Sequence, residues 1–267
     1  MKIDMHCHVK EGSPDSKVSL DEYITILKAN GFEGMLITDH DTYKGYRYWK
    51  NKMKGKSHED YDTCDAGHII VIMPEGVKMR LLELKGLPVS VLIDFVHRHG
   101  GVLGPAHPCG EKYMSFTNTK RFYKNPEIIK RFDFIEVFNA CESMESNEKA
   151  AKLAYKYQKV GIGGSDAHRP NCVSMAYTDL PERVTCETEL ISLIRKKVPL
   201  EVGGMLYNKT TKEKLGKANK ILVYSFWIYN KTGGLIKRSK RKRKSMLENP
   251  IDPIDPIEME YLANYKR

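Results

Sequence analysis

The sequence predicts an α/β fold in which apolar strands alternate with helices around one core. Nearly continuous apolar runs recur between segments of helical periodicity, which is typical of a parallel sheet covered by helices. Polar side chains gather where these runs end, and the carboxyl ends of strands form the site in closed barrels and in open doubly wound sheets. Ligands from so many strands converge more easily in a barrel, so we favour a closed (β/α) barrel.

The amino-terminal residues predict a strand, a helix and a second strand. Residues 2–8 are the first strand. Ser19 begins the helix, Glu22 completes a capping box three residues later, and Asn30 with the following Gly ends the helix. The apolar run from Gly34 to Asp41 is the next strand, which completes a βαβ unit.

The same alternation continues along the chain. The expected strands lie at 67–74, 102–108, 132–139 and 160–168, and the expected helices at 89–99, about 144–158 and 187–197. The polar and basic segment 44–56 is expected to be a surface helix and loop. These elements are long enough in total to bury a sizeable core.

The composition changes near residue 210, so we expect one domain over residues 1–209 and an appendage over 210–267. The apolar, β-rich run Ile221–Tyr229 precedes a turn with two glycines, which predicts a β-hairpin. In residues 249–257 a proline recurs at every third position, which excludes a regular helix there.

The basicity of the chain is mostly local. The formal charge is +10, and seven of the eight residues from Lys237 to Lys244 are Lys or Arg. Without those seven charges the chain would carry +3. The block at 237–244 predicts either salt-dependent binding of RNA or another oligonucleotide without sequence preference, or a solvated tail that keeps the protein soluble.

Composition also indicates the compartment. The sequence contains no apolar run of the roughly twenty residues that a membrane helix needs, and its amino end has no signal-peptide core. Six scattered cysteines without a Cys-x-x-Cys pattern predict reduced thiols rather than a disulfide framework. We therefore expect a cytoplasmic protein that does not act at a membrane.

Two short patterns predict a metal site. His6-Cys-His8 ends the first strand, and Asp166-Ala-His168 ends a distant one. Side chains two residues apart on a strand point to the same side, so each pair presents two ligands together. A set of two imidazoles from one strand, together with a carboxylate and an imidazole from another, is suited to bind a divalent ion. Asp4 shares the face of His6 and His8, and we expect it to support them.

Five motifs occur in a fixed order: Asp4-Met-His6-Cys-His8, Thr38-Asp-His40-Asp41, Gly67-His68, Ala106-His107-Pro108 and Gly164-Ser-Asp166-Ala-His168. Together they resemble the PHP (polymerase and histidinol phosphatase) family of metal-dependent phosphoesterases. The residues after His168 resemble the PHP-associated carboxyl segment of that family, which we place at about residues 164–209. The resemblance implies a distorted (β/α)7 TIM-like barrel that holds two or three divalent ions and hydrolyses phosphate esters by a metal-bound hydroxide.

The resemblance also implies ligands for each ion. They are His6, His8 and Asp166 for the first ion, His68 and His107 for the second, and His40 and His168 for the third, with Asp15 as a further candidate. Imidazole and oxygen donors suit Zn, Mn or Fe, so the identity of the metals is open. The bridging Glu of the family has no direct match, and Asp60 is the best substitute, with Glu59 and Glu75 as alternatives.

Other residues near the motifs are expected to take part in catalysis. Asp166 and His168 are the expected catalytic residues, and either His168 or the third ion would assist the leaving alkoxide. Arg169 is a candidate to hold the phosphate through two N–H donors, or an ordinary surface residue. Asn139 is a candidate substrate contact or a strand cap. Asp39 is expected to orient His40 or a neighbouring imidazole.

Two functional classes follow. The first is a phosphoesterase that acts on a nucleotide, an oligonucleotide or a small phosphomonoester. The second is a non-hydrolytic, metal-containing protein that binds nucleic acid through its basic block. Turnover of a generic phosphate ester distinguishes the two classes.

Overall fold

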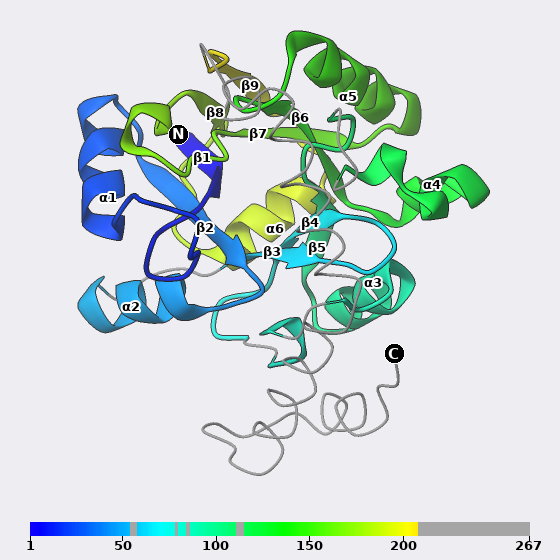
Figure 1. Ribbon diagram of the computed structural model, residues 1–267, viewed down its shortest axis with the longest axis horizontal. Coiled ribbons are helices and arrows are strands. Elements are labelled where there is room, and N and C mark those ends of the chain that lie inside the picture. Colours follow the sequence, from blue (N-terminus) through cyan, green and yellow to red (C-terminus); the bar gives the residue numbers. More distant parts are fainter. Residues whose placement is uncertain (54–57, 78–79, 84–85, 111–114, 208–267) are drawn as a thin grey trace, which may run out of the picture. The chain divides into compact units, whose positions relative to one another are not determined.

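The computed structural model describes residues 1–53, 58–77, 80–83, 86–110 and 115–207 (Figure 1). The chain divides into two compact units, one of residues 1–77 with 86–207 and one of residues 78–85 with 208–267. Only the short 3-10 helix η1 (Arg80–Glu83) is described in the second unit. The predicted hairpin, basic block and Pro-rich close lie outside the described residues, and the boundary at 209 stays a prediction.

The strands of the described chain form two sheets. The bounds are β1 (Lys2–Cys7), β2 (Gly34–His40), β3 (His58–Asp62), β4 (His68–Ile72), β5 (Val102–Pro105), β6 (Phe134–Asn139), β7 (Val160–Gly164), β8 (Ala176–Asp179) and β9 (Glu201–Gly204). The larger sheet has the order β5-β4-β3-β2-β1-β8-β9, and β6 pairs with β7 in the smaller one.

In Figure 1 the helices α1 to α5 surround the strands, and α6 lies at the centre of the view. Their bounds are α1 (Leu20–Ala29), α2 (Lys44–Met53), α3 (Val89–Arg98), α4 (Lys120–Lys124), α5 (Met144–Tyr157) and α6 (Glu187–Arg195), with short 3-10 helices η2 (Phe116–Asn118), η3 (Pro126–Arg131) and η4 (Pro170–Cys172). Ser19 is confirmed as the N-cap of the first helix, because Ser19 Oγ accepts a hydrogen bond from Glu22 N at 3.3 Å, which is one of the two contacts of a capping box. The segment predicted as a surface helix and loop contains α2.

The expectation of a fully parallel sheet is wrong. β1 pairs in parallel with β2, and β2 with β3, but β4 runs antiparallel to both β3 and β5. The connection from Asp62 to His68 is short, and a short connection joins antiparallel strands, whereas a parallel pair needs a long crossover. The reversal of β4 places its first residue, His68, at the edge where the parallel strands end. An apolar strand in sequence does not reveal its direction, which is why the prediction missed it.

Both strands of the smaller sheet connect to the larger sheet, β6 to its edge strand β5 and β7 to its interior strand β1. Asp133, just before β6, donates its N–H to the Leu103 carbonyl of β5 at 2.9 Å. Just after β7, Asp166 N donates to His6 O at 2.8 Å, and Cys7 forms a parallel bridge with Ala167. Continuous strand pairing does not run around the described strands, so a mixed α/β fold is observed and the predicted closed barrel is not confirmed.

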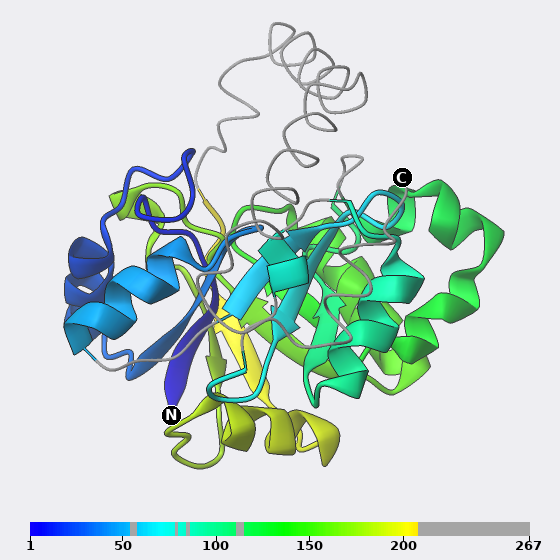
Figure 2. The ribbon, with the colours of Figure 1, turned by 90° about the horizontal axis from the view of Figure 1, so that it is seen from below.

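The core closes one end of the strands. α6 lies across the end where the amino terminus is located (Figure 2). Its buried residues Leu190, Ile191 and Ile194 belong to the same apolar cluster as Met5 of β1 and Phe134 of β6. Burying large apolar side chains in this way stabilises the fold by about 1.5–3 kcal/mol for each side chain. The opposite end of the strands is left for polar residues.

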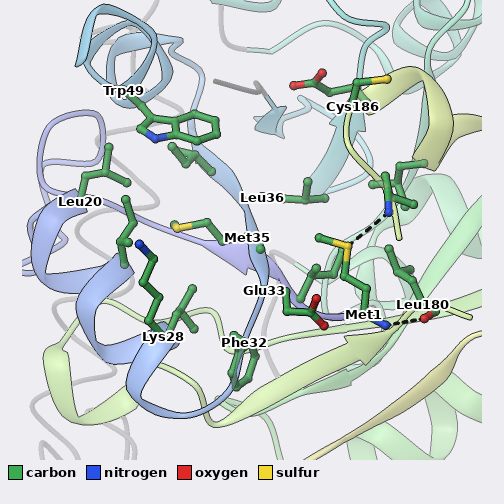
Figure 3. Close-up of a pocket in the computed structure, with 18 residues that line it drawn as sticks. Met1, Leu20, Lys28, Phe32, Glu33, Met35, Leu36, Trp49, Leu180 and Cys186 are labelled. Atoms are coloured by element: carbon green, nitrogen blue, oxygen red, sulfur yellow. Dashed lines mark hydrogen bonds between the residues drawn. The ribbon is translucent and has the colours of Figure 1, made fainter. Parts of the chain in front are cut away.

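A mostly apolar cavity of about 350 Å³ opens near this closed end (Figure 3). Leu20 and Leu27 of α1, Met35 of β2, Trp49 of α2 and Leu190 of α6 line parts of it. None of the motif histidines lines it. Within the described part of the chain, no helix is long and apolar enough to cross a membrane. All six cysteines are free thiols.

Candidate metal centre

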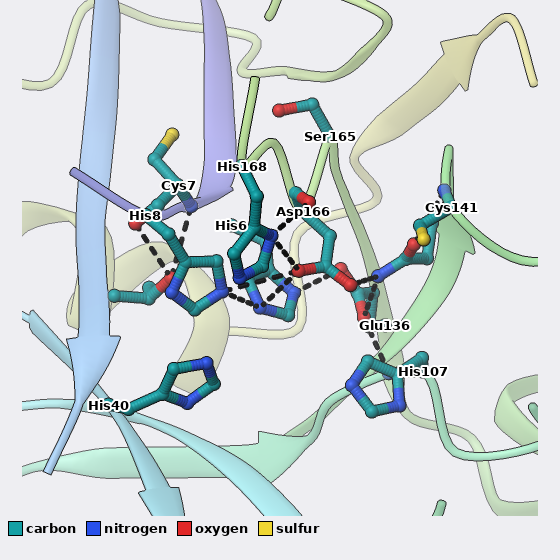
Figure 4. Close-up of polar contacts among 12 residues, drawn as sticks. His6, Cys7, His8, His40, His107, Glu136, Cys141, Ser165, Asp166 and His168 are labelled. Atoms are coloured by element: carbon teal, nitrogen blue, oxygen red, sulfur yellow. Dashed lines mark hydrogen bonds and ion pairs between the residues drawn. The ribbon is translucent and has the colours of Figure 1, made fainter. Parts of the chain in front are cut away.

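Imidazoles from distant parts of the chain meet beyond the carboxyl ends of β1 and β2 (Figure 4). The ring of His8 stacks on the rings of His40 and His168 with centroid distances of 4.4 Å in each case. The rings of His6 and His107 are 6.0 Å apart. Residues far apart in sequence therefore form one polar cluster.

His6, His8 and Asp166 form a compact group of three donors. His6 Nε2 is 3.0 Å from His8 Nε2, His8 Nε2 is 3.2 Å from Asp166 Oδ1, and His6 Nε2 is 3.6 Å from the same oxygen. Ligands about 2.0–2.1 Å from a tetrahedral zinc ion are separated by about 3.3 Å from one another. The triangle of donors therefore has the size of one face of a zinc coordination shell.

The protonation states of this group favour a cation. Burial and the neighbouring imidazoles of His168 and His40 lower the pKa of His8 to about 3, so its ring is neutral at ordinary pH. Burial alone would raise the pKa of Asp166, but the neighbouring imidazoles hold it well below its usual value. His6 Nδ1 contacts Glu136 Oε1 at 2.9 Å, and His8 Nδ1 contacts Ser13 Oγ at 3.3 Å. With a proton on each Nδ1, both Nε2 lone pairs and the carboxylate converge, and a divalent ion between them removes the repulsion.

A second group contains His8, His40 and His168. Asp15 Oδ2 lies 3.3 Å from His168 Nε2 and 3.7 Å from His40 Nε2. A neutral imidazole has one lone pair, at the nitrogen without the proton, so His8 Nε2 completes only one of the two groups. Asp15 supplies the third donor that His40 and His168 would otherwise lack.

The remaining predicted ligands lie around the same cluster. The rings of His68 and His107 are 5.3 Å apart, and the rings of His40 and His68 are also 5.3 Å apart. Among the described residues, this pair is not part of a compact group of three donors. Asp60 lies in β3, next to His40 in the register of β2 and β3, and the side chains of Asp60 and Glu59 lie outside the described part of the structure. The polar stretch around them is nevertheless a strand, which the sequence analysis did not expect.

The sequence analysis assigned no role to Glu136, one of the polar residues near the end of an expected strand. This side chain is only 1% exposed, and it contacts the His6 ring through Oε1. Its Oε2 accepts hydrogen bonds from His107 N at 2.5 Å and Asn139 Nδ2 at 3.1 Å. Glu136 thus joins β6 to the ends of β1 and β5. The signal for it in the sequence is a charged residue inside an otherwise apolar strand.

Asn139 is built into the site rather than open to a substrate. It is 1% exposed, and its Nδ2 donates to Glu136 Oε2 and, at 3.3 Å, to Asp166 Oδ2. Its Oδ1 accepts from Cys141 N at 2.8 Å. The structure therefore places the amide between two carboxylates, where it orients them, and the hydrogen bond from Cys141 N fits the expected alternative of a strand cap.

Asp4 holds the backbone of the site instead of facing the imidazoles. The register between β1 and β2 shifts between Asp4 and Cys7, so Asp4 does not follow the alternation expected for His6. Asp4 Oδ1 accepts from His6 N at 3.2 Å and from Ser165 N at 2.9 Å. Asp4 Oδ2 accepts from Tyr23 Oη at 3.0 Å. The carboxylate therefore ties the end of β7 to β1.

Several site residues have unusual backbone conformations. Asp41, His107 and Asp166 have φ values of 46°, 29° and 52°, a left-handed region that non-glycine residues rarely adopt. Such strain persists only where surrounding contacts impose it, and it is common at functional sites. For Asp166, these contacts are the Asp4 interactions of Ser165 and the hydrogen bond from Asp166 N to His6 O.

Two other predicted residues lie at the margins. Arg169 follows His168 and is partly exposed, and no hydrogen bond or ion pair of its guanidinium with a described residue is found. Glu75 is exposed beyond the far end of β4, and its N–H donates to Thr188 Oγ1 near the start of α6. The reversal of β4 therefore puts Glu75 at the opposite end of the strand from His68.

Comparison with solved structures shows a shared fold. PsfC from Pseudomonas syringae is 14% identical with a TM-score of 0.53, over 84% of this chain and 98% of that one. A proposed metal-dependent phosphoesterase from Bifidobacterium adolescentis is 16% identical with a TM-score of 0.50, over 72% and 96%. The lesion-specific endonuclease Q of Pyrococcus furiosus is 16% identical with a TM-score of 0.52, over 76% of this chain and 58% of that one.

Sequence comparison adds one match. Curated protein sequences give no significant match to this chain. Residues 144–199 match the family model described as PHP-associated. The match runs from α5 through α6, includes Asp166 and His168, and overlaps the expected segment 164–209 while starting earlier. Together with the shared fold, it confirms the resemblance of this chain to the PHP-domain metal-dependent phosphoesterases.

Proposed function

We propose that this protein is a metal-dependent hydrolase of phosphate esters with its site at the polar ends of β1, β2 and β7. The observation that carries the proposal is the triangle of donors formed by His6, His8 and Asp166, which has the size of one face of a zinc shell. The resemblance to PHP phosphoesterases supports the reaction class, and it also supports a distorted (β/α)7 barrel as the complete form of the sheet.

Two sets of three side chains in the candidate metal centre have the donors to bind a divalent ion each. His6, His8 and Asp166 would hold one ion, and His40, His168 and Asp15 would hold another. His68 and His107 would supply donors for a third ion, and Asp60 of β3 is the acidic residue that the sequence analysis assigns to the bridging position. Bound ions would activate water and neutralise the developing charge on the phosphoryl oxygens. Zn, Mn and Fe all suit this mixed set of imidazole and carboxylate donors.

The protein residues would contribute orientation and proton handling. Glu136 and Asn139 hold His6 and Asp166 in place, so these donors need little rearrangement. Burial alone would lower the pKa of His168, but its hydrogen bond to Asp15 and the charge of Asp166 raise it. A His168 that is not bound to an ion can therefore hold a proton at Nε2 for a leaving oxygen. Arg169, next to His168 in sequence and partly exposed, would bind a pair of phosphate oxygens through two N–H donors.

The substrate we favour is a nucleotide or a nucleic acid. The basic block at 237–244 would attract a polyanion, and endonuclease Q, which shares the fold, acts on nucleic acid. Replacing the seven Lys and Arg residues of the block by Gln should reduce the affinity for single-stranded RNA and flatten its dependence on salt. If the affinity for RNA and its salt dependence do not change, the basic block at 237–244 does not take part in substrate binding.

Hydrolysis of p-nitrophenyl phosphate and bis-p-nitrophenyl phosphate, with Zn or Mn added, tests the reaction class. We expect turnover by the full chain and a loss of at least about 100-fold in His8→Ala and Asp166→Ala. His97→Ala is the matched control, because His97 pairs with Asp133 away from the cluster. Stoichiometric metal without turnover of either ester would instead support the non-hydrolytic nucleic-acid-binding protein.

A further inference from the structure

The loop after β1 brings a hydroxyl and a carboxylate behind the ring of His8. Ser13 Oγ lies 3.3 Å from His8 Nδ1 and donates to Asp39 Oδ1 at 2.8 Å. Ser13, Asp39 and His8 are all 0% exposed. Because the hydroxyl has one proton and it points to Asp39, the oxygen of Ser13 is left to accept a hydrogen bond from His8.

The same contacts fix Asp39 and Ser13 in the fold. Asp39 Oδ1 also accepts from Val9 N at 2.9 Å, and Ser13 N donates to Val9 O at 2.8 Å. His40 N donates to Ser13 Oγ at 3.4 Å. The pair therefore connects the loop after β1 to the end of β2, the two segments that carry His8 and His40.

Asp39 packs so closely against Gly12 and Gly45 that neither position has room for a side chain. A Cβ atom on Gly12 would lie 1.9 Å from Asp39 Oδ2, and one on Gly45 would lie 2.0 Å from it. Asp39 Oδ2 has no hydrogen-bond partner among the described residues. The carboxylate therefore directs its hydrogen bonds through Oδ1 alone, toward Val9 and Ser13.

We propose that Ser13, held by Asp39, is a positioning residue that fixes the ring of His8 with Nε2 directed at the metal of the His6, His8 and Asp166 group. This inference rests on the proposed metal centre. The hydrogen bond at Nδ1 keeps the proton there, so the lone pair stays on Nε2, where the other two donors converge. Neither Ser13 nor Asp39 contacts the ion itself in this arrangement.

The test compares two serines of one loop. Ser13→Ala removes the contact with the His8 ring. Ser16→Ala leaves that contact in place and removes the 2.8 Å hydrogen bond from Ser16 Oγ to the His8 carbonyl and the 3.3 Å hydrogen bond from Val18 N to Ser16 Oγ. Zn²⁺ is titrated into the full-length, metal-free protein against a chromophoric chelator. Loss of such a supporting contact costs about 10–100-fold in metal affinity, and we expect that loss in Ser13→Ala and less than about threefold in Ser16→Ala.

A spectroscopic measurement separates positioning from general damage to the loop. In protein loaded with Co²⁺, the visible absorption reports the ligand geometry, and we expect it to change in Ser13→Ala but not in Ser16→Ala. Equal Zn²⁺ affinity of Ser13→Ala and wild type, or equal losses in both serine variants, would overturn the inference.

Asp39→Asn covers the case in which Ser13→Ala does not fold. Its amide oxygen can still accept from Val9 and Ser13, so we expect a folded protein. A neutral amide is a weaker acceptor than a carboxylate, so Ser13 is held less firmly and we expect weaker Zn²⁺ binding than in wild type. Binding as tight as wild type would remove Asp39 from the arrangement. Because these measurements follow Zn²⁺ and Co²⁺ binding, a protein that binds the metals but hydrolyses no ester contradicts only the proposed function.

Discussion

His8 has the most constrained position in the candidate metal centre. Its ring is fully buried, contacts Ser13 on one side and stacks on His40 and His168. Two groups of donors include it, but its one lone pair can serve only one ion. The short distances to His6 Nε2 and Asp166 Oδ1 assign it to the first group. Two ions bound in the proposed way would therefore depend on different residues.

This assignment gives an expectation for metal stoichiometry. His40→Ala should bind one Zn²⁺ fewer than wild type while retaining the ion held by His6, His8 and Asp166. His8→Ala should lose that first ion instead. Elemental analysis after dialysis, combined with Zn²⁺ titration, measures both. If the two variants lose the same ion, His8 belongs to the second group.

Glu136 is expected to support metal binding through His6 without contacting the ion itself. It contacts the Nδ1 side of His6, so Glu136→Gln would replace a charged acceptor with an amide. We expect Zn²⁺ affinity to fall by about 10–100-fold, because the acceptor fixes the ring and strengthens Nε2 as a donor. Glu145→Gln, on the exposed start of α5, is the control. Similar affinities for the two variants would argue against this role.

The pair of Asp15 and His168 makes stability depend on pH in the metal-free protein. The folded-state pKa of His168 is raised above its ordinary value of 6.5, so the resulting stability is fully present below about pH 6.5 and is lost as the pH rises through the folded value. Asp15→Asn should therefore destabilise by up to about 1 kcal/mol near pH 6, since Asp15 is exposed, and by almost nothing near pH 9.

Urea unfolding of the two metal-free proteins at both pH values measures this difference. A cost of Asp15→Asn that stays the same at high pH would show that the ion pair is not its source. An NMR titration of His168 should show a lower pKa in the variant, because the partner that raises it is gone.

At the scale of elements, the site depends on how closely β7 approaches β1. A Cβ atom on Gly164 would lie 2.3 Å from His6 Cβ and 2.5 Å from His6 N. This spacing lets Asp166 N reach His6 O and brings the Asp166 carboxylate to the two imidazoles. Only a residue without a side chain permits it.

Gly164→Ala should therefore cost about 1–3 kcal/mol of stability and weaken Zn²⁺ binding, because β7 must move away from β1. Gly161→Ala, in the same strand, is the matched control: its nearest neighbour is the side chain of Val137 at 2.9 Å, which can rotate aside. Urea unfolding and Zn²⁺ titration compare the two. Equal effects would show that any side chain in β7 is disruptive, whatever its distance from His6.

The elements were predictable where local patterns decide them. The capped helix α1, the buried strands and α5 follow from periodicity, caps and turns. β3 was missed because His58–Asp62 is polar, and its pairing with β2 and β4 is a tertiary effect. The direction of β4 was missed because it also depends on tertiary pairing. This direction decides which end of β4, the one with His68 or the one with Glu75, lies near the cluster.

The expected metal ligands were predictable from the sequence, but the residues that hold those ligands in position were not. His6, His8 and Asp166 carry a recognisable spacing, and the structure brings them within 3.6 Å of one another. Ser13, Glu136 and the tie made by Asp4 depend on contacts between residues distant in sequence, or on a shift in register. A local pattern, such as the charged Glu136 inside an apolar strand, can mark a buried polar residue, but it does not show which distant residue is its partner.

At the scale of the molecule, one end of the strands contributes mainly to stability and the other end forms the candidate metal centre. α6 and its apolar partners close one end, where large side chains supply stability. Buried histidines and carboxylates occupy the other end, where burial without a partner is costly. Metal binding therefore compensates an otherwise unfavourable group of donors, and Zn²⁺ at about 100 times its Kd should add about 2.7 kcal/mol of stability.

The most direct test of the metal centre is an anomalous-difference map at the zinc edge from crystals of the full chain grown with Zn²⁺. We expect a peak about 2.0–2.2 Å from His6 Nε2, His8 Nε2 and Asp166 Oδ1. Zinc bound elsewhere, or no peak between these three atoms, would contradict the account.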